Sequence, residues 1–151
     1  MNGNDWMDVV TVVLEQHEAA EYSLREVAET SGDARADRLR SLTMRLSAHE
    51  AAEEDVIYPA LRQLGAEGAA VADARTSEEA QTRELLTALA DMEPTSTEFS
   101  ERFEELMNGV LEHAEHERIS VLPLLQASFS DHERRAMGDA FLAAQHHRPN
   151  E

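Results

Sequence analysis

The chain has 151 residues and no cysteine, with 31 acidic and 13 basic residues that give a net charge of −18. This length is typical of one ordinary domain, and the charge argues against partners with phosphate backbones or anionic lipid surfaces. The absence of cysteine excludes disulfides, thiolate nucleophiles, iron–sulfur clusters and cysteine-bound zinc.

No apolar run reaches the roughly 18 residues that a membrane span needs. The first eight residues also lack a basic region followed by an apolar one, so no secretory signal is expected. We therefore expect a cytoplasmic protein without membrane or nucleic-acid partners. Scarce glycine and proline, with abundant Ala, Glu, Leu and Arg, favour helix throughout.

The first helix is expected to begin near Asn4 or Asp5, where Asp5 can cap it and Asp8 completes a capping-box-like pair. It should end at 31–33, a Ser-Gly-Asp sequence. Its apolar positions recur at helical spacing and are Trp6, Val9, Val10, Val13, Leu14, Leu24 and Val27.

The second helix should end at Gly65 and Gly68, with Ile57, Leu61 and Leu64 among its apolar positions, and Pro59 should kink it or end its regular part. Its helical periodicity predicts one continuous buried line through Leu39, Leu42, Leu46, His49, Glu53, Val56 and Ala60. The third helix covers roughly residues 69–92 and closes before Pro94.

The fourth helix begins near Ser96 or Thr97, and Ser130-x-x-Glu133 predicts a capping box for a short fifth helix that ends near Gln145. Four amphipathic helices with short loops predict an all-α fold. We expect an antiparallel up-down four-helix bundle over about 5–126 and a capping helix over about 131–145, in a single domain of residues 1–151.

The same pattern occurs twice, at 49–59 and 113–123: a histidine, a glutamate four residues later and a proline six residues after that. Residues four apart share one helix face. The pairs His49/Glu53 and His113/Glu117 both fall on buried apolar lines, and His17/Glu21 continues the line of the first helix.

Three buried histidine–glutamate pairs need a shared partner, because an unpaired buried carboxylate costs several kcal/mol. A metal cation supplies that partner, and imidazole with carboxylate suits iron, manganese or zinc. Glu53 and Glu117 come from different helices and can bridge two ions. The alternative is a set of hydrogen-bonded His–Glu pairs without metal, or helices whose charges face water.

The sequence resembles the hemerythrin-like HHE cation-binding family over about residues 5–126, and the matching stretches are 16–18, 49–59 and 113–123. The resemblance implies an up-down bundle around two iron ions bridged by an oxo or hydroxo group, with manganese or zinc as substitutes. It implies metal-ligand roles for His17, His49, Glu53, His113 and Glu117.

The third helix departs from the family pattern, because 77–89 contains no histidine. Alignment of Leu85, Leu86 and Leu89 puts Glu79 at the family's histidine position, with Glu78 as second choice. Extra anionic oxygen ligands favour the oxidised, harder ion, which suits reaction with peroxide, nitric oxide or O₂ better than O₂ storage.

Glu21, one turn beyond His17, is either an additional ligand or a hydrogen-bond acceptor that orients a histidine. His116 is one residue off the ligand line and should be exposed or support a ligand. Tyr58 is expected to pack as an aromatic and Tyr22 to lie at the core edge, while surface positions are expected for His132, His146 and His147.

These features favour a di-iron protein that consumes O₂, H₂O₂ or NO with catalase-like, peroxidase-like or oxidase-like chemistry. The alternatives are an O₂ or NO sensor or carrier, an iron-binding protein, and a metal-free helical interaction domain. No further apolar stripe lies outside the bundle faces, so a monomer or weak homodimer is expected.

Overall fold

The computed structural model describes residues 8–146, and these residues are helical with no strand among them. Two of the elements, η2 and η3, are wide π-helical turns of five residues each. The elements in chain order are α1 (Val9–Glu29), α2 (Gly32–Ala52), η2 (Glu53–Ile57), α3 (Tyr58–Arg62), α4 (Ala66–Ala90), α5 (Thr97–His116), η3 (Glu117–Val121), α6 (Leu122–Ser128) and α7 (Asp131–His146).

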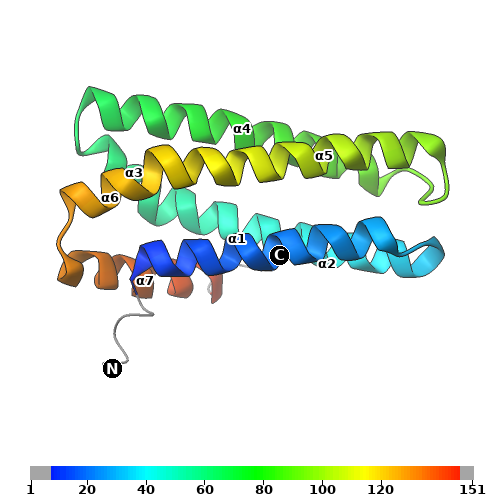
Figure 1. The fold of residues 1–151 in the computed structure, drawn as a ribbon, viewed down its shortest axis with the longest axis horizontal. Coiled ribbons are helices and arrows are strands. Elements are labelled where there is room, and N and C mark those ends of the chain that lie inside the picture. The colour runs from blue at the N-terminus through cyan, green and yellow to red at the C-terminus, as the bar shows by residue number, and fades with distance from the viewer. Residues whose placement is uncertain (1–7, 147–151) are drawn as a thin grey trace.

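The long helices α1, α2, α4 and α5 lie lengthwise beside one another in Figure 1, so the described residues form the predicted helical bundle. Helix α2 continues through η2 into α3, and α5 continues through η3 into α6. Helix α7 lies at one end of the bundle, where it packs against α1, α2 and η2. Within residues 8–146, no helix combines the length and the apolar character of a membrane span.

Helix α1 begins later than the sequence suggested. Its N-cap is Asp8, whose Oδ1 accepts the backbone N–H of Val10 at 2.9 Å. Asp5 and Trp6 lie outside the described residues. Helix α2 then starts at Gly32, whose φ of +66° suits a residue without Cβ in the turn between the two helices.

The other helix ends follow the predicted signals closely. Ser96 caps α5 by accepting the N–H of Phe99 at 3.1 Å. The capping box before α7 is confirmed: Ser130 N–H donates to Glu133 Oε1 at 2.8 Å, and Glu133 N–H donates to Ser130 Oγ at 3.1 Å. Helix α4 starts at Ala66, three residues before the predicted start.

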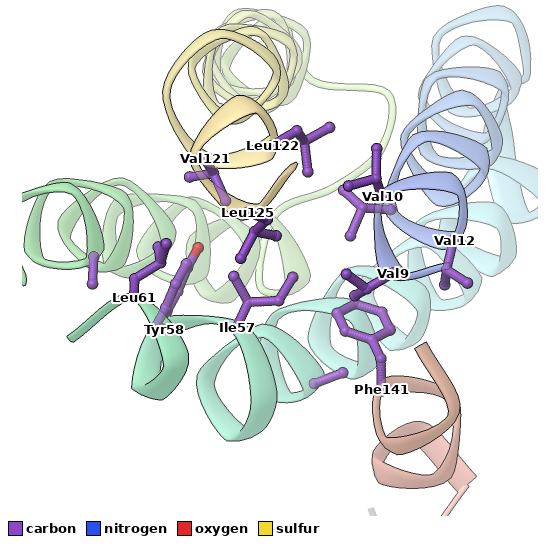
Figure 2. Packing of buried hydrophobic residues seen from close by; sticks show 13 residues of the cluster. Val9, Val10, Val12, Ile57, Tyr58, Leu61, Val121, Leu122, Leu125 and Phe141 are labelled. Carbon is purple, nitrogen blue, oxygen red and sulfur yellow. The ribbon is translucent and has the colours of Figure 1, made fainter. Parts of the chain in front are cut away.

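The apolar core has two parts, and His17 on α1, His49 on α2 and His113 on α5 each lie between them along the chain. The part near α7 is drawn in Figure 2, where Phe141 of α7 lies beside Val9 of α1. The other part fills the opposite end of the bundle with Leu24, Val27, Leu42, Leu89, Phe99 and Leu106 among its residues. Leu14 is 39% exposed and Leu64 is 37% exposed. Both were predicted among the apolar positions of their helices, but neither belongs to the core.

Each of the two repeated prolines follows a π-helical turn. In η2 the N–H of Tyr58 donates to the carbonyl of Glu53, five residues back, and in η3 the N–H of Leu122 donates to the carbonyl of Glu117. The proline that follows each turn has no N–H to donate.

Each wide turn adds one residue to the helix, and this residue shifts the buried face. After Glu53 the buried side chains are Ile57, Tyr58 and Leu61, whereas Val56 and Ala60 are only partly buried. The continuous line predicted through Val56 and Ala60 is therefore wrong beyond Glu53, because it assumed the regular period of 3.6 residues per turn.

Candidate metal centre

The centre of the bundle holds two glutamates at corresponding positions, Glu53 at the first residue of η2 and Glu117 at the first residue of η3. Both side chains are buried. Each has the histidine of its own pattern one turn before it: His49 Nε2 lies 3.0 Å from Glu53 Oε2, and His113 Nε2 lies 3.4 Å from Glu117 Oε2. The doubled pattern thus converges on one buried space.

Two further helices add one predicted residue each. From α1, His17 Nε2 lies 2.9 Å from Glu117 Oε1. From α4, Glu79 is 0% exposed, and its Oε2 lies 3.3 Å from His113 Nε2. The carboxylate expected at the family's histidine position therefore lies inside the cluster.

Six side chains form two overlapping groups, in each of which one nitrogen or oxygen per residue lies within 4.8 Å of the others. The groups share Glu53 and Glu117, as two adjacent cations bridged by carboxylates would require. One group consists of His17, His49, Glu53 and Glu117, and the other of Glu53, Glu79, His113 and Glu117.

Two atoms of the second group test whether a cation fits. In the described part of the chain, His113 Nε2 and Glu79 Oε1 are buried without a hydrogen-bond partner. An unsatisfied buried polar atom costs about 1–3 kcal/mol, and a bound cation would satisfy both of these. Imidazole nitrogens with carboxylate oxygens form a donor set that suits iron, manganese or zinc, so the residues fit such an ion.

Tyr58 belongs to the same site, although the sequence indicated only a packing role. Its buried ring lies beside Ile57 and Leu61 in Figure 2. Its hydroxyl oxygen, however, lies near a carboxylate oxygen of each of three residues: Glu79 at 2.7 Å, Glu117 at 3.0 Å and Glu53 at 3.2 Å. A phenol has one proton and can donate it to only one of them.

The π-helical turn explains why sequence reasoning missed Tyr58. Tyr58 follows Glu53 by five residues, which in a regular α-helix would turn it about 140° away from the glutamate. The wide turn brings the fifth residue back over the first. The proline that follows Tyr58 is the signal that could have indicated this.

Glu78, the second choice on the third helix, faces the outer side of the histidines. Its carboxylate lies 2.7 Å from Nδ1 of His113 and 2.5 Å from Nδ1 of His116, and it also pairs with Arg75. A carboxylate on the outer nitrogen of a histidine fixes the ring and leaves Nε2 free for a ligand role. His116 is thus a partly buried supporting residue, as expected.

Glu21 lies outside both groups. It pairs with Arg25, and its side chain is 43% exposed, because the buried face of α1 passes from His17 to Ala20 and Leu24. Tyr22 is 64% exposed and does not lie at the core edge as predicted. His132 and His146 are exposed as expected, and His147 is outside the described residues.

Burial and mutual charge set unusual protonation in the cluster. Burial lowers the pKa of His49 to about 4, and burial together with the Glu117 carboxylate holds the pKa of Glu53 well above its usual range. Burial would lower the pKa of His113, but the nearby carboxylates of Glu117, Glu53 and Glu79 outweigh it and raise the pKa.

A small cavity of about 40 Å³ adjoins the three histidines. A cavity of this size has room for a molecule as small as water, O₂ or peroxide. Its other walls combine apolar residues with polar ones: Ala20, Leu46, Val110, Leu111 and Ala114 on one hand, and Gln16, Glu21, Arg45, Glu50 and Thr82 on the other. The cavity thus lies among α1, α2, α4 and α5.

Comparison with known proteins agrees with this geometry. The model of the hemerythrin HHE cation binding domain matches residues 8–125. A protein of Nostoc sp. strain PCC 7120 named DNA nickase is 28% identical over 101 residues, which cover 66% of this chain and 28% of that protein. An uncharacterized hemerythrin-like protein of Schizosaccharomyces pombe is 29% identical over 97 residues, covering 64% of this chain and 48% of the relative.

The chain thus spans less than half the length of either relative. No solved structure matches it. The family match covers most of the chain and includes α1, α2, α4 and α5, the helices that carry the buried histidines and Glu79. The chain belongs to the hemerythrin HHE cation-binding family.

Proposed function

We propose that this protein binds two iron ions in the buried cluster and reacts with O₂, H₂O₂ or NO, as a catalase-like, peroxidase-like or oxidase-like protein. The observation that carries the proposal is the pair of overlapping ligand groups that share Glu53 and Glu117. His17 and His49 would complete one ion position, and His113 and Glu79 the other. Manganese or zinc could replace iron with the same donors.

Tyr58 would add a phenolate oxygen to the donor set. Its hydroxyl lies within 3.2 Å of all three carboxylates, so it adjoins both groups. Burial and the three carboxylates raise the pKa of Tyr58, and a bound cation would counteract both effects. Bound iron would supply the redox equivalents, while the chain orients the donors and excludes bulk water.

The composition of the two groups supports turnover over storage. One group contains two imidazoles, whereas the other contains one imidazole and Glu79. Additional anionic oxygen stabilises the oxidised ion, which disfavours reversible release of O₂. The small cavity beside the histidines suits a diatomic molecule or peroxide.

Several finer expectations are part of this proposal. They are the antiparallel up-down order of the four long helices, a single domain of 1–151, a cytoplasmic location and a monomer or weak homodimer. Although one relative is named DNA nickase, the net charge of −18 favours a role without nucleic acid.

The test is the iron content per chain by elemental analysis of protein expressed with iron, together with the visible spectrum and O₂ evolution after addition of peroxide. About two irons per chain and O₂ release are expected. Two irons without turnover would favour a carrier or sensor. Less than one equivalent of any metal would contradict the proposal.

A further inference from the structure

The C-terminal helix α7 reaches the candidate metal centre from outside the segment that the family model matches, which ends at residue 125. Two of its residues carry the contact. Phe141 is buried, and its ring meets the ring of His49 edge-on, with centroids 5.5 Å apart and planes at 70°. Gln145, one turn later, contacts Gln16 of α1.

Gln16 and Gln145 form a reciprocal pair of amides. Gln145 Nε2 donates to Gln16 Oε1 at 2.7 Å, and Gln16 Nε2 donates to Gln145 Oε1 at 2.9 Å. The same Gln16 oxygen lies 2.8 Å from Nδ1 of His49. A carbonyl oxygen has two lone pairs, so it can accept from both donors at once.

This arrangement determines which nitrogen of His49 carries the proton. Because Gln16 Oε1 is an acceptor, Nδ1 of His49 is the N–H donor, and the lone pair of the neutral ring is on Nε2. Nε2 is the atom that faces Glu53, at 3.0 Å. Gln16 therefore contacts the Nδ1 side of His49, opposite the nitrogen that faces the cluster, as Glu78 contacts Nδ1 of His113.

Helix α7 is itself held firmly enough to act in this way. Its capping box fixes its start, and Arg134 donates from Nε to Asp8 Oδ2 at 3.0 Å, which ties α7 to the beginning of α1. Phe141 joins the apolar core formed with α1 and α3. The orientation of Gln145 thus follows from the packing of the whole helix.

We propose that α7 positions the metal centre: Gln145 holds Gln16, and Gln16 holds His49 with Nδ1 protonated and Nε2 presented to a cation. This inference rests on the proposed function, because it assumes that a cation occupies the cluster. Phe141 limits rotation of the ring from the α7 side. Gln16 and Gln145 are positioning residues, since neither belongs to the two ligand groups.

The test compares Gln16→Leu, which keeps the approximate shape but removes the acceptor, with Gln16→Glu, whose carboxylate still accepts from Nδ1. Gln126→Leu, at an exposed position of α6, is the matched control. Fe²⁺ affinity is measured without oxygen by competition with a chelator. The protonated nitrogen of His49 is identified by nitrogen-15 NMR of the metal-free protein, and the melting temperature of the metal-free protein reports folding.

Gln16→Leu is expected to weaken Fe²⁺ binding about 10–100-fold and to abolish the preference for Nδ1–H, as loss of a partner behind a ligand does. Gln145→Met should weaken binding less. Gln16→Glu should bind like the wild type, and Gln126→Leu should change nothing. If Gln16→Leu also melts earlier, rescue by Gln16→Glu still separates positioning from general stability.

Equal Fe²⁺ affinity in the wild type and Gln16→Leu would overturn this inference alone. A failure of Gln16→Glu to rescue the affinity would also overturn it. A wild-type protein that binds no Fe²⁺ would instead overturn the proposed function and, with it, the role of α7 at a metal.

Discussion

Tyr58 places a hydroxyl group among the buried carboxylates of the candidate metal centre. Its oxygen lies in the middle of three carboxylates that cannot all remain charged in a buried space without a cation. Its position follows from the turn in which it lies rather than from the residue type. A tyrosine one residue earlier or later would face a different part of the bundle.

Tyr58→Phe should remove a phenolate-to-iron absorption from the visible spectrum of the iron-loaded protein while both irons remain bound. Both irons are expected to stay bound because the six side chains of the two ligand groups remain when the phenolate oxygen is lost. The measurement is the difference spectrum at equal iron content, with Tyr22→Phe at an exposed site as the control. An unchanged spectrum in Tyr58→Phe would exclude coordination by Tyr58.

Glu79→His restores the histidine that the family presents on this helix. Replacement of an anionic oxygen by a neutral nitrogen stabilises the reduced ion relative to the oxidised one. The reduction potential of the iron-loaded protein, measured by spectroelectrochemistry, should therefore rise, and peroxide turnover should fall. Glu78→Gln is the comparison, because Glu78 is the neighbouring acidic residue on α4 but contacts Nδ1 of His113 instead of the ligand cluster. A potential that stays constant or falls in Glu79→His would refute the assigned role.

Glu50 gives a pH dependence with a definite sign. Burial and the charge of Glu79 raise its pKa to about 8 from 4.5, against the opposing effect of Arg83. The folded protein therefore keeps a proton that the unfolded chain releases between these pH values, so the free energy of unfolding falls as the pH rises through this window. The slope is at most about 1.4 kcal/mol per pH unit.

Glu50→Gln should flatten this slope in the metal-free protein. Urea unfolding at about pH 5 and about pH 8 measures it, since Glu50→Gln should lose less stability between the two pH values than the wild type does. Glu54→Gln serves as the control, because Glu54 also contacts Arg83 but is exposed. Equal slopes in Glu50→Gln and the wild type would show that Glu50 stays ionised in the fold.

At the scale of elements, the two π-helical turns and α7 together shape the site, and α7 packs directly against η2. Each turn begins at a glutamate shared by the two groups and ends two residues before a proline. The turn in η2 allows Glu53 and Tyr58 to face the same space. Helix α7 closes the end of the bundle and contacts His49.

Ser130→Ala should lower the free energy of unfolding by about 1 kcal/mol, because it leaves the N–H of Glu133 without its capping oxygen. Urea unfolding of the metal-free protein measures this loss. Ser100→Ala, at an exposed position inside α5, should not destabilise the protein. Equal stability of Ser130→Ala and the wild type would show that packing alone holds the start of α7.

For the whole molecule, a bound metal should be part of the stability of the fold. A cation that binds only the folded chain stabilises it by about 2.7 kcal/mol at a hundredfold excess over its dissociation constant. Removal of the metal with a chelator should therefore lower the melting temperature of the loaded wild type.

The control is the double variant Glu53→Gln with Glu117→Gln, which lacks both shared carboxylates. Its melting temperature should be the same with and without the chelator. A wild-type protein that melts at one temperature in both conditions would argue for a metal-free helical bundle.

The helical class, the caps at Ser96 and Ser130, and the buried histidine–glutamate pairs of α2–η2 and α5–η3 could be predicted from the sequence alone. These features depend on local chemistry and on regular periodicity, which can be read along one helix at a time. The position of Glu79 also followed from alignment of the leucines of α4 with the family pattern.

Only the tertiary structure decided the roles of Tyr58, Glu21 and Gln145. The position of the Tyr58 hydroxyl depends on a wide turn that breaks the regular helical period. The exposure of Glu21 depends on which face of α1 packs against the core. Gln145 meets its partner Gln16 across 129 residues of sequence. Contacts of that kind arise from the packing of whole helices, for which no local pattern in the chain provides a signal.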